Sequence, residues 1–216
     1  MHRLLENIIT DTELQYLESV FLNGTHIISN GMDKVALPLD DADFIALVTD
    51  IIEQRLGITA PYDIVGDNFY KHSHSYFPHC DALEDTAWLN IVIPISRIGA
   101  KADQKFIVFD QHWRGRNITW LGSYEFPGDF HSNKKTNDRP SDSELLENST
   151  GAALPMELWD NIEQKYFTLD YFQGLSGTAY DWQPGNVLVF DSSHPHATGR
   201  MQSTSKLGIS IRIAHK

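Results

Sequence analysis

Apolar residues recur at helical spacing in two stretches near the N-terminus. The first stretch covers residues 11–22. Thr10, just before it, and Glu13 have the spacing of a capping box, which marks the start of a helix. The second runs from Phe44, just after a pair of aspartates, to Gly57, a residue type that commonly ends helices. Because a helix with one apolar face needs another layer to cover, we expect both helices to pack on a sheet.

From residue 62 onward the pattern changes to short runs of β-branched and aromatic residues separated by turn residues, which is typical of strands. A short strand is also expected near the N-terminus, where apolar residues cluster between positions 4 and 9. This pattern predicts a mainly β protein of the α+β class. The expected strands after residue 60 cover 62–70, 77–82, 87–95, 105–110, 117–121, 178–182, 186–191 and 206–214, and a short helix is expected over 156–165.

The last expected strand has two chemically different faces. Isoleucines alternate with the residues Lys206, Gly208, Ser210 and Arg212. The isoleucine face can pack beneath the helices, so the other face places a cation inside the protein. A buried cation is costly unless it meets an anion, and a dicarboxylate ligand would supply one.

The length of 216 residues suits one domain with a sizeable core. We expect residues 1–60 to form a helical buttress and residues 62–214 to form the β core. Residues 128–155 are polar and carry little periodicity, and a loop this long is usually functional or disordered. A lid over a site and a loose insertion are both consistent with that segment.

Charge and cysteine content exclude several classes of protein. The formal net charge of -12 argues against nucleic acid as the main partner, because phosphate binding needs a basic face. The single cysteine, Cys80, rules out an internal disulfide and a zinc site of the CxxC type. The sequence shows no secretion signal and no long apolar run, so we expect a soluble cytoplasmic protein without a membrane segment.

One pair of residues points to a metal. His79 and Asp81 are two apart on an expected strand, so both side chains point to the same side. A second histidine far along the chain could complete the set, and His196 and His194 are the candidates. Two histidines and one carboxylate form the facial triad of non-haem Fe(II) oxygenases, which leaves coordination positions open. The same pair also arises by chance in a chain with ten histidines.

Four features in order make the chain resemble the Fe(II)/2-oxoglutarate-dependent dioxygenase superfamily, in particular its prolyl 4-hydroxylase-like branch. The histidine–aspartate pair is the first, and Tyr70, nine residues before His79, is the second. The third is the segment 184–191 leading to His196, which is similar to a "pGdlvlF…H" segment of the family. The fourth is a cation after that histidine, either Lys206 ten residues later or Arg212 sixteen residues later.

The resemblance implies a double-stranded β-helix, or jelly roll, buttressed by the N-terminal helices. It also implies Fe(II), 2-oxoglutarate and O₂ as cofactors, with ascorbate as a candidate reductant. The metal ligands would be His79, Asp81 and His196, and the candidate 2-oxoglutarate contacts are Arg212, Lys206, Tyr70, Ser210 and Asn90. Because Asp81 fills the position that halogenating relatives leave open, the expected reaction is hydroxylation of a small molecule or a peptidyl side chain.

Several alternatives stay open on the sequence. A cupin-like iron oxygenase would need no buried cation on the last strand. A non-catalytic jelly-roll binding module would use exposed aromatic residues such as Trp113, Trp120 and Trp182. His72 and His74 could line the substrate entrance or face solvent, and Arg114 and Arg116 are candidate substrate contacts. The substrate itself and the oligomeric state have no signature in the sequence.

Overall fold

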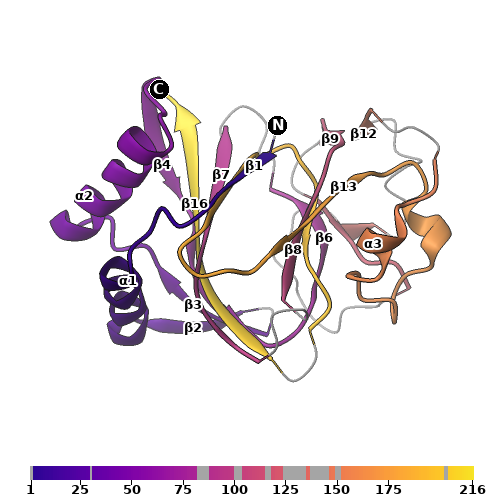
Figure 1. Cartoon of the computed structure of the whole chain (residues 1–216), viewed down its shortest axis with the longest axis horizontal. Helices are drawn as coiled ribbons and strands as arrows, with labels where there is room; N and C mark the ends of the chain where they lie inside the picture. The colour runs from indigo at the N-terminus through magenta and orange to yellow at the C-terminus, as the bar shows by residue number, and fades with distance from the viewer. Residues whose placement is uncertain are drawn as a thin grey trace.

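The computed structural model describes residues 2–29, 31–81, 88–99, 104–114, 118–123, 135–136, 146–148, 152–201 and 204–216. Most of them form two mainly antiparallel sheets that face each other (Figure 1). Seven strands of the larger sheet lie side by side in the order β1 (His2–Leu5), β14 (Val187–Asp191), β7 (Leu89–Ile98), β16 (Ser205–His215), β5 (Asn68–His72), β3 (Met32–Ala36) and β2 (His26–Ser29). An eighth strand, β4 (Tyr62–Gly66), also pairs with β16.

The smaller sheet holds six strands in the order β11 (Lys135–Thr136), β10 (Ile118–Trp120), β6 (Tyr76–Cys80), β15 (His196–Thr198), β8 (Lys105–Phe109) and β13 (Gly177–Asp181). A separate pair of short strands joins β9 (His112–Trp113) to β12 (Leu146–Glu147). A helix, α3 (Met156–Trp159), and a short 3₁₀ turn (Leu169–Phe172) pack beside the smaller sheet. The expectation of a mainly β jelly roll is confirmed.

Two helices cover the outer face of the larger sheet, as expected. Helix α1 (Asp11–Asn23) and helix α2 (Ala42–Asp50) lie on the same side of β16 (Figure 1). Beneath them, Ile209, Ile211 and Ile213 of β16 are fully buried in one apolar cluster with residues of both helices. The opposite face of β16 therefore points between the two sheets, which is where the alternation placed Lys206 and Arg212.

The second helix departs from the expected single run to Leu56. After Asp50 it continues as a π-helix over Ile51–Arg55, and Gly57 then ends it with a φ of +70°. A π-helix is a rare, wider turn and often marks a site with a special requirement. Here it places Arg55 next to helix α1, where its guanidinium contacts Glu13.

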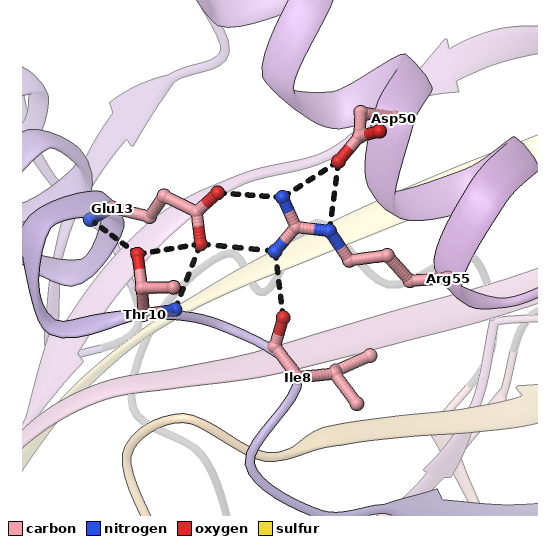
Figure 2. A network of polar contacts seen from close by, with 5 residues as sticks. All are labelled: Ile8, Thr10, Glu13, Asp50 and Arg55. Atoms are coloured by element: carbon pink, nitrogen blue, oxygen red, sulfur yellow. Dashed lines mark hydrogen bonds and ion pairs between the residues drawn. The ribbon is translucent and has the colours of Figure 1, made fainter.

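Arg55 joins the two helices through a network of polar contacts, drawn in Figure 2. Its Nη2 lies 2.6 Å from a carboxylate oxygen of Glu13 and 2.6 Å from one of Asp50, and its Nη1 donates to the carbonyl of Ile8. Glu13 also accepts from the backbone N–H of Thr10 at 2.8 Å, which completes the predicted capping box. The hydrogen bond from Arg55, opposed in part by burial, lowers the pKa of Glu13 to about 2.

Arg55→Met should lower the free energy of unfolding by about 1.5–3 kcal/mol, the range for hydrogen bonds to charged groups. The pKa of Glu13 is lowered in the folded state, so the network stabilises fully above the unfolded pKa near 4.5 and fades as pH falls toward 2. Urea unfolding at pH 7 and pH 3 measures this. The difference between wild type and variant should shrink at pH 3, whereas Asp40→Asn, an exposed control, should change little at either pH.

Three other expectations need correction or fall outside the described residues. The sequence does not predict the hairpin β2–β3. Ile27 and Ile28 are adjacent and both exposed, so the first strand shows no alternation of apolar and polar positions. The expected strand over 62–70 is two strands, β4 and β5, separated by a bulge at Asp67. Most of the loop over 128–155 lies outside the described residues, which include only 135–136, 146–148 and 152–155 of it. Among the described residues, no helix is long and apolar enough to cross a membrane.

Candidate metal centre and its pocket

The three expected metal ligands meet on the smaller sheet. His79 lies on β6, Asp81 directly follows that strand, and His196 opens β15, where it is the direct cross-strand partner of His79. The Nε2 of His196 lies 3.3 Å from one carboxylate oxygen of Asp81, and the Nε2 of His79 lies 3.9 Å from the other. All three ligand atoms fall within 4.8 Å of one another, close enough to hold one metal ion.

Backbone carbonyls fix the orientation of both imidazoles. The Nδ1 of His79 lies 2.9 Å from the carbonyl oxygen of Phe77, and the Nδ1 of His196 lies 3.1 Å from that of His194. A proton on each Nδ1 satisfies these contacts, so Nε2 is the nitrogen of each ring that lies beside the carboxylate of Asp81 and that a metal could bind. This arrangement, in which the second ring nitrogen donates to a carbonyl, is the usual support for a metal-ligating histidine.

The charges of the three residues also suit a cation. Burial lowers the pKa of His79 to about 4, assisted by repulsion from His196, so this ring is neutral at physiological pH. Burial alone would raise the pKa of Asp81, but the hydrogen bond from His196 and the charges nearby outweigh it and lower that pKa. A neutral imidazole and an ionised carboxylate are the forms that bind a divalent metal.

The triad forms one wall of a cavity of about 270 Å³ between the two sheets. The cavity runs along the inner face of β16, and the hairpin β2–β3 forms part of its rim. Described residues that line it, besides the triad, are Ser29, Met32, Lys34, Asp67, Asn68, Tyr70, His72, Tyr76, Val92, Phe106, Thr119, Phe190, Thr198, Ser210 and Arg212. The rings of Phe106 and Phe190 pack on His196, with centroids 5.7 and 4.8 Å away, so the metal position is shielded on one side by apolar groups.

Lys206 is the buried cation that the alternation of the last strand predicted. It is 1% exposed, its Nζ lies 4.2 Å from the ring centroid of Trp182, and it donates only to the carbonyl of Lys105 at 3.3 Å. No carboxylate in the part of the chain that the structure describes forms an ion pair with it. Burial accordingly lowers its pKa to about 7.

Tyr70 and His72 extend from β5 toward the same end of the cavity as Lys206. The ring centroids of Tyr70 and His72 lie 5.7 Å apart, and His72 is the cross-strand partner of Lys206. The Nε2 of His72 is buried and has no hydrogen-bond partner among the described residues. This end of the cavity is therefore lined by an imidazole nitrogen and a phenol, while Lys206 lies next to them, buried, without lining the cavity itself.

Arg212 lies at the other end of the cavity, and it does meet a carboxylate. Its Nε is 3.7 Å from Oδ2 of Asp67. Asp67 sits at a bulge where the register of β4 against β16 shifts, and its φ of +140° is unusual for a residue with a side chain. Such a conformation costs on the order of 1–3 kcal/mol and tends to occur at functional sites. Burial raises the pKa of Asp67 despite the attraction of Arg212.

The remaining predicted contacts take different places. Asn90 is buried behind the triad, where its amide lies 3.5 Å from a carboxylate oxygen of Asp81, and it does not line the cavity. Ser210 lines the cavity, and its hydroxyl contributes a hydrogen bond to Asp67. His194 points away from the triad and packs on the ring of His112, with centroids 4.1 Å apart.

The aromatic residues that a binding module would expose are buried. Trp113, Trp120 and Trp182 are 4%, 1% and 1% exposed, so none of the three could serve the binding-module alternative as a surface aromatic. Trp113 and Trp120 pack edge to face with centroids 5.3 Å apart, and Trp182 lies beneath Tyr70 and Lys206. Arg114 is exposed and pairs with Glu147 away from the cavity, while Arg116 lies outside the described residues.

Sequence reasoning missed several residues that line the cavity. Asp67 had a usable signal, because a Gly-Asp pair inside a strand pattern often marks a bulge. Lys34 and Ser29 had none, since the hairpin that carries them has no strand alternation. His72 was weighed as either solvent-facing or pocket-lining, and the structure places it in the pocket while His74 lies outside it.

No protein-family model matches the sequence, and no curated protein is significantly similar to it. Solved structures do resemble it. HygX from Streptomyces hygroscopicus, with nickel and 2-oxoglutarate bound, has a TM-score of 0.58 at 11% identity and covers 100% of this chain and 83% of its own. The epimerase SnoN, in complex with Fe³⁺, alpha ketoglutarate and nogalamycin RO, has a TM-score of 0.56 at 12% identity, covering 99% and 78%.

A prolyl-4-hydroxylase from Pseudomonas putida has a TM-score of 0.54 at 10% identity and covers 100% of this chain and 92% of its own. A 2OG-Fe(II) oxygenase family oxidoreductase from Burkholderia pseudomallei has a TM-score of 0.53 at 11% identity, covering 99% and 84%. These likenesses span 99–100% of this chain, although only 10–12% of the residues are identical. The chain therefore has the fold of the Fe(II)/2-oxoglutarate-dependent oxygenases.

Proposed function

We propose that this protein is an Fe(II)- and 2-oxoglutarate-dependent oxygenase that hydroxylates a small-molecule or peptidyl substrate. The observation that carries the proposal is the convergence of His79, Asp81 and His196 on one point at the wall of the cavity. The fold supports it, because similar structures hold 2-oxoglutarate with nickel or Fe³⁺. The HygX and SnoN structures also hold hygromycin B and nogalamycin RO, which favours a small-molecule substrate.

His79, Asp81 and His196 would hold the iron. They form the two-histidine, one-carboxylate set that non-haem Fe(II) enzymes use, and the triad borders the cavity. Iron bound there supplies O₂ activation coupled to the decarboxylation of 2-oxoglutarate to succinate and CO₂. Asn90 holds the carboxylate of Asp81 from behind, so we assign it a positioning role.

Lys206 is the better of the two candidate anchors for the far carboxylate of 2-oxoglutarate. Lys206 and Arg212 are six residues apart on one strand, about 20 Å at ~3.3 Å per residue, so they cannot serve the same carboxylate. Arg212 already faces Asp67, whereas Lys206 is buried without an acidic partner. A buried cation without an anion is unfavourable, and a dicarboxylate bound between the sheets would pair with it.

Tyr70 and His72 complete this end of the site. Both line the cavity, which Lys206 does not, and the Nε2 of His72 has no hydrogen-bond partner among the described residues. The Nδ1 of His72 donates to the carbonyl of His74 at 2.8 Å, so its Nε2 is an acceptor and cannot donate to a carboxylate. The phenol of Tyr70 is the group here that can donate to the carboxylate beside Lys206. Ser210, which the sequence also offered, is engaged with Asp67 at the other end of the cavity.

The buried lysine predicts a pH dependence of 2-oxoglutarate binding. The pKa of Lys206 is lowered to about 7 in the free protein, and binding a carboxylate requires the charged form. Above pH 7 the protein must therefore take up a proton when 2-oxoglutarate binds, and affinity should fall about tenfold per pH unit. Calorimetry at pH 8.5 in two buffers of different ionisation enthalpy measures the uptake. Uptake near zero would show that Lys206 is not the partner of the ligand.

The two alternatives from the sequence are less well supported. An iron oxygenase that does not use 2-oxoglutarate gives no reason for an unpaired cation beside the cavity. A binding module would not need the triad, and the tryptophans that would serve it are buried. Because the similar fold of SnoN belongs to an epimerase, the outcome of the reaction is best settled by analysis of the product.

Succinate formation tests the proposal without knowledge of the substrate. Purified protein with Fe(II), O₂ and 2-oxoglutarate should release succinate slowly even when no substrate is added. The release should require iron and stop in Asp81→Ala. Iron-loaded protein that forms no succinate, and that does not bind 2-oxoglutarate, would favour the cupin-like alternative.

A further inference from the structure

The pair Asp67 and Arg212 is not explained by iron or by 2-oxoglutarate. It lies at the opposite end of β16 from Lys206, beside the triad, and both side chains line the cavity. The pair is only about one-fifth exposed, at 19% for Asp67 and 21% for Arg212. A ligand that reaches the open side of the metal from this end would contact both charges.

Arg212 offers an incomplete anion site. Its single contact with Asp67 spans 3.7 Å, which is too long for a hydrogen bond. Its Nε is buried and has no hydrogen-bond partner within the described ranges. A planar guanidinium matches a carboxylate with two parallel hydrogen bonds, so a carboxylate is the ligand group that fits best.

Asp67 offers a fixed carboxyl group next to it, and although burial raises its pKa, an ammonium bound there would favour the ionised form. The amide of Asn68 donates to its Oδ1, and Ser210 donates to the same carboxylate. These contacts hold the group in place but use only part of its capacity, because an ionised carboxylate has about four acceptor positions. The bulge and the positive φ of Asp67 are what turn the side chain into the cavity. An ammonium is the ligand group that would complete its bonding.

We propose that Asp67 and Arg212 bind the primary substrate, and that this substrate is a free α-amino acid. The inference rests on the proposed function and narrows it. An α-amino acid carries its ammonium and its carboxylate on one carbon atom, which matches two opposite charges whose nearest atoms are 3.7 Å apart. A residue inside a peptide has neither charge, so the pair selects the free amino acid over a peptidyl side chain.

The size and charge of the cavity agree with this substrate class. Pockets for drug-sized ligands range from about 300 to 1,000 Å³, and this cavity of about 270 Å³ must also hold 2-oxoglutarate. The charges of Fe(II), Asp81, Lys206 and the dianion of 2-oxoglutarate sum to zero. The remaining charged groups are Asp67, Arg212 and Lys34, which all line the cavity. A small zwitterion or a monoanion is compatible with these remaining charges.

The test begins with binding, which needs no turnover. The standard L-α-amino acids are added one at a time to the Fe(II)- and 2-oxoglutarate-loaded protein under anaerobic conditions, and the melting temperature is recorded. The best ligand is then compared with two analogues, one lacking the ammonium and one lacking the carboxylate. Wild type, Asp67→Asn, Arg212→Gln and the control Asp63→Asn are measured, since Asp63 pairs with Lys216 outside the cavity. Succinate release is measured in parallel with O₂ present.

One or a few amino acids should raise the melting temperature and stimulate succinate release in wild type and in the control. Each analogue should bind about tenfold or more weaker in wild type. Asp67→Asn should lose the preference for the ammonium alone, and Arg212→Gln the preference for the carboxylate alone. Both variants should still bind 2-oxoglutarate like wild type.

Two results would overturn the inference. If no amino acid changes the melting temperature or succinate release of protein that binds 2-oxoglutarate, the substrate class is wrong. If Arg212→Gln loses 2-oxoglutarate binding, the arginine belongs to the cosubstrate site. Failure of wild type to bind 2-oxoglutarate at all would instead refute the proposed function, and the melting measurements on metal-loaded protein would still decide whether the pair binds an amino acid.

Discussion

His196→Ala should abolish both iron binding and 2-oxoglutarate turnover. The substitution removes one of three ligand atoms that lie within 4.8 Å of one another, and water cannot replace the imidazole with equal affinity. Loss of a residue that only supports a ligand costs about 10–100-fold, so loss of the ligand itself should exceed that range. Iron content after anaerobic loading and dialysis, together with succinate release, measures the effect.

His194→Ala is the matched control, because it lies two residues away and was the competing candidate for the third ligand. Its backbone carbonyl, which contacts His196, is kept in the variant. Iron binding and succinate release should therefore remain close to wild type, even if the loss of packing on His112 lowers the melting temperature. Loss of iron in His194→Ala with retention in His196→Ala would reverse the assignment of the metal ligand.

Lys206→Met should weaken 2-oxoglutarate binding without destabilising the free protein. Methionine keeps the apolar stem that packs on Trp182 and removes a buried charge that has no acidic partner. Removing one member of a buried charge pair costs about 2–5 kcal/mol, which corresponds to a roughly 30-fold to several-thousand-fold loss of affinity. In the free protein the same change should be neutral or stabilising, because an unpaired buried charge is replaced by an apolar group.

Calorimetry with 2-oxoglutarate and thermal unfolding without it separate these two effects. Lys71→Met is the control, since Lys71 neighbours His72 on β5 but is exposed and points away from the cavity. It should leave affinity and stability unchanged. If Lys206→Met binds 2-oxoglutarate normally while Arg212→Gln does not, the two cations have exchanged roles, and the assignment of Arg212 to the substrate fails as well.

The sequence predicted the elements that follow a simple periodicity. The isoleucines of β16 and the apolar stripe of helix α1 each mark one buried face, and the structure buries them together. The histidine–aspartate spacing predicted two adjacent ligands, because alternate residues of a strand share a side. These predictions depend only on local geometry, which is why they needed no knowledge of the rest of the fold.

The rest depends on contacts between residues distant in the chain. Whether Lys206 or Arg212 has an acidic partner is decided by Asp67, which lies far from both in sequence and faces the cavity only because of a bulge. The hairpin β2–β3 exposes Ile27 and Ile28, so its strands carry no alternation to read. The three tryptophans that a binding module would expose are buried by partners that the sequence does not identify.

The visible charge-transfer band of the Fe(II)–2-oxoglutarate chelate tests the central claim most directly. Protein is prepared without metal under anaerobic conditions, and Fe(II) and then 2-oxoglutarate are added to wild type, His196→Ala and Lys206→Met. The account predicts a band in wild type, no band in His196→Ala, and a band in Lys206→Met only at much higher 2-oxoglutarate concentration. Wild-type protein that binds Fe(II) but develops no band with 2-oxoglutarate would contradict it.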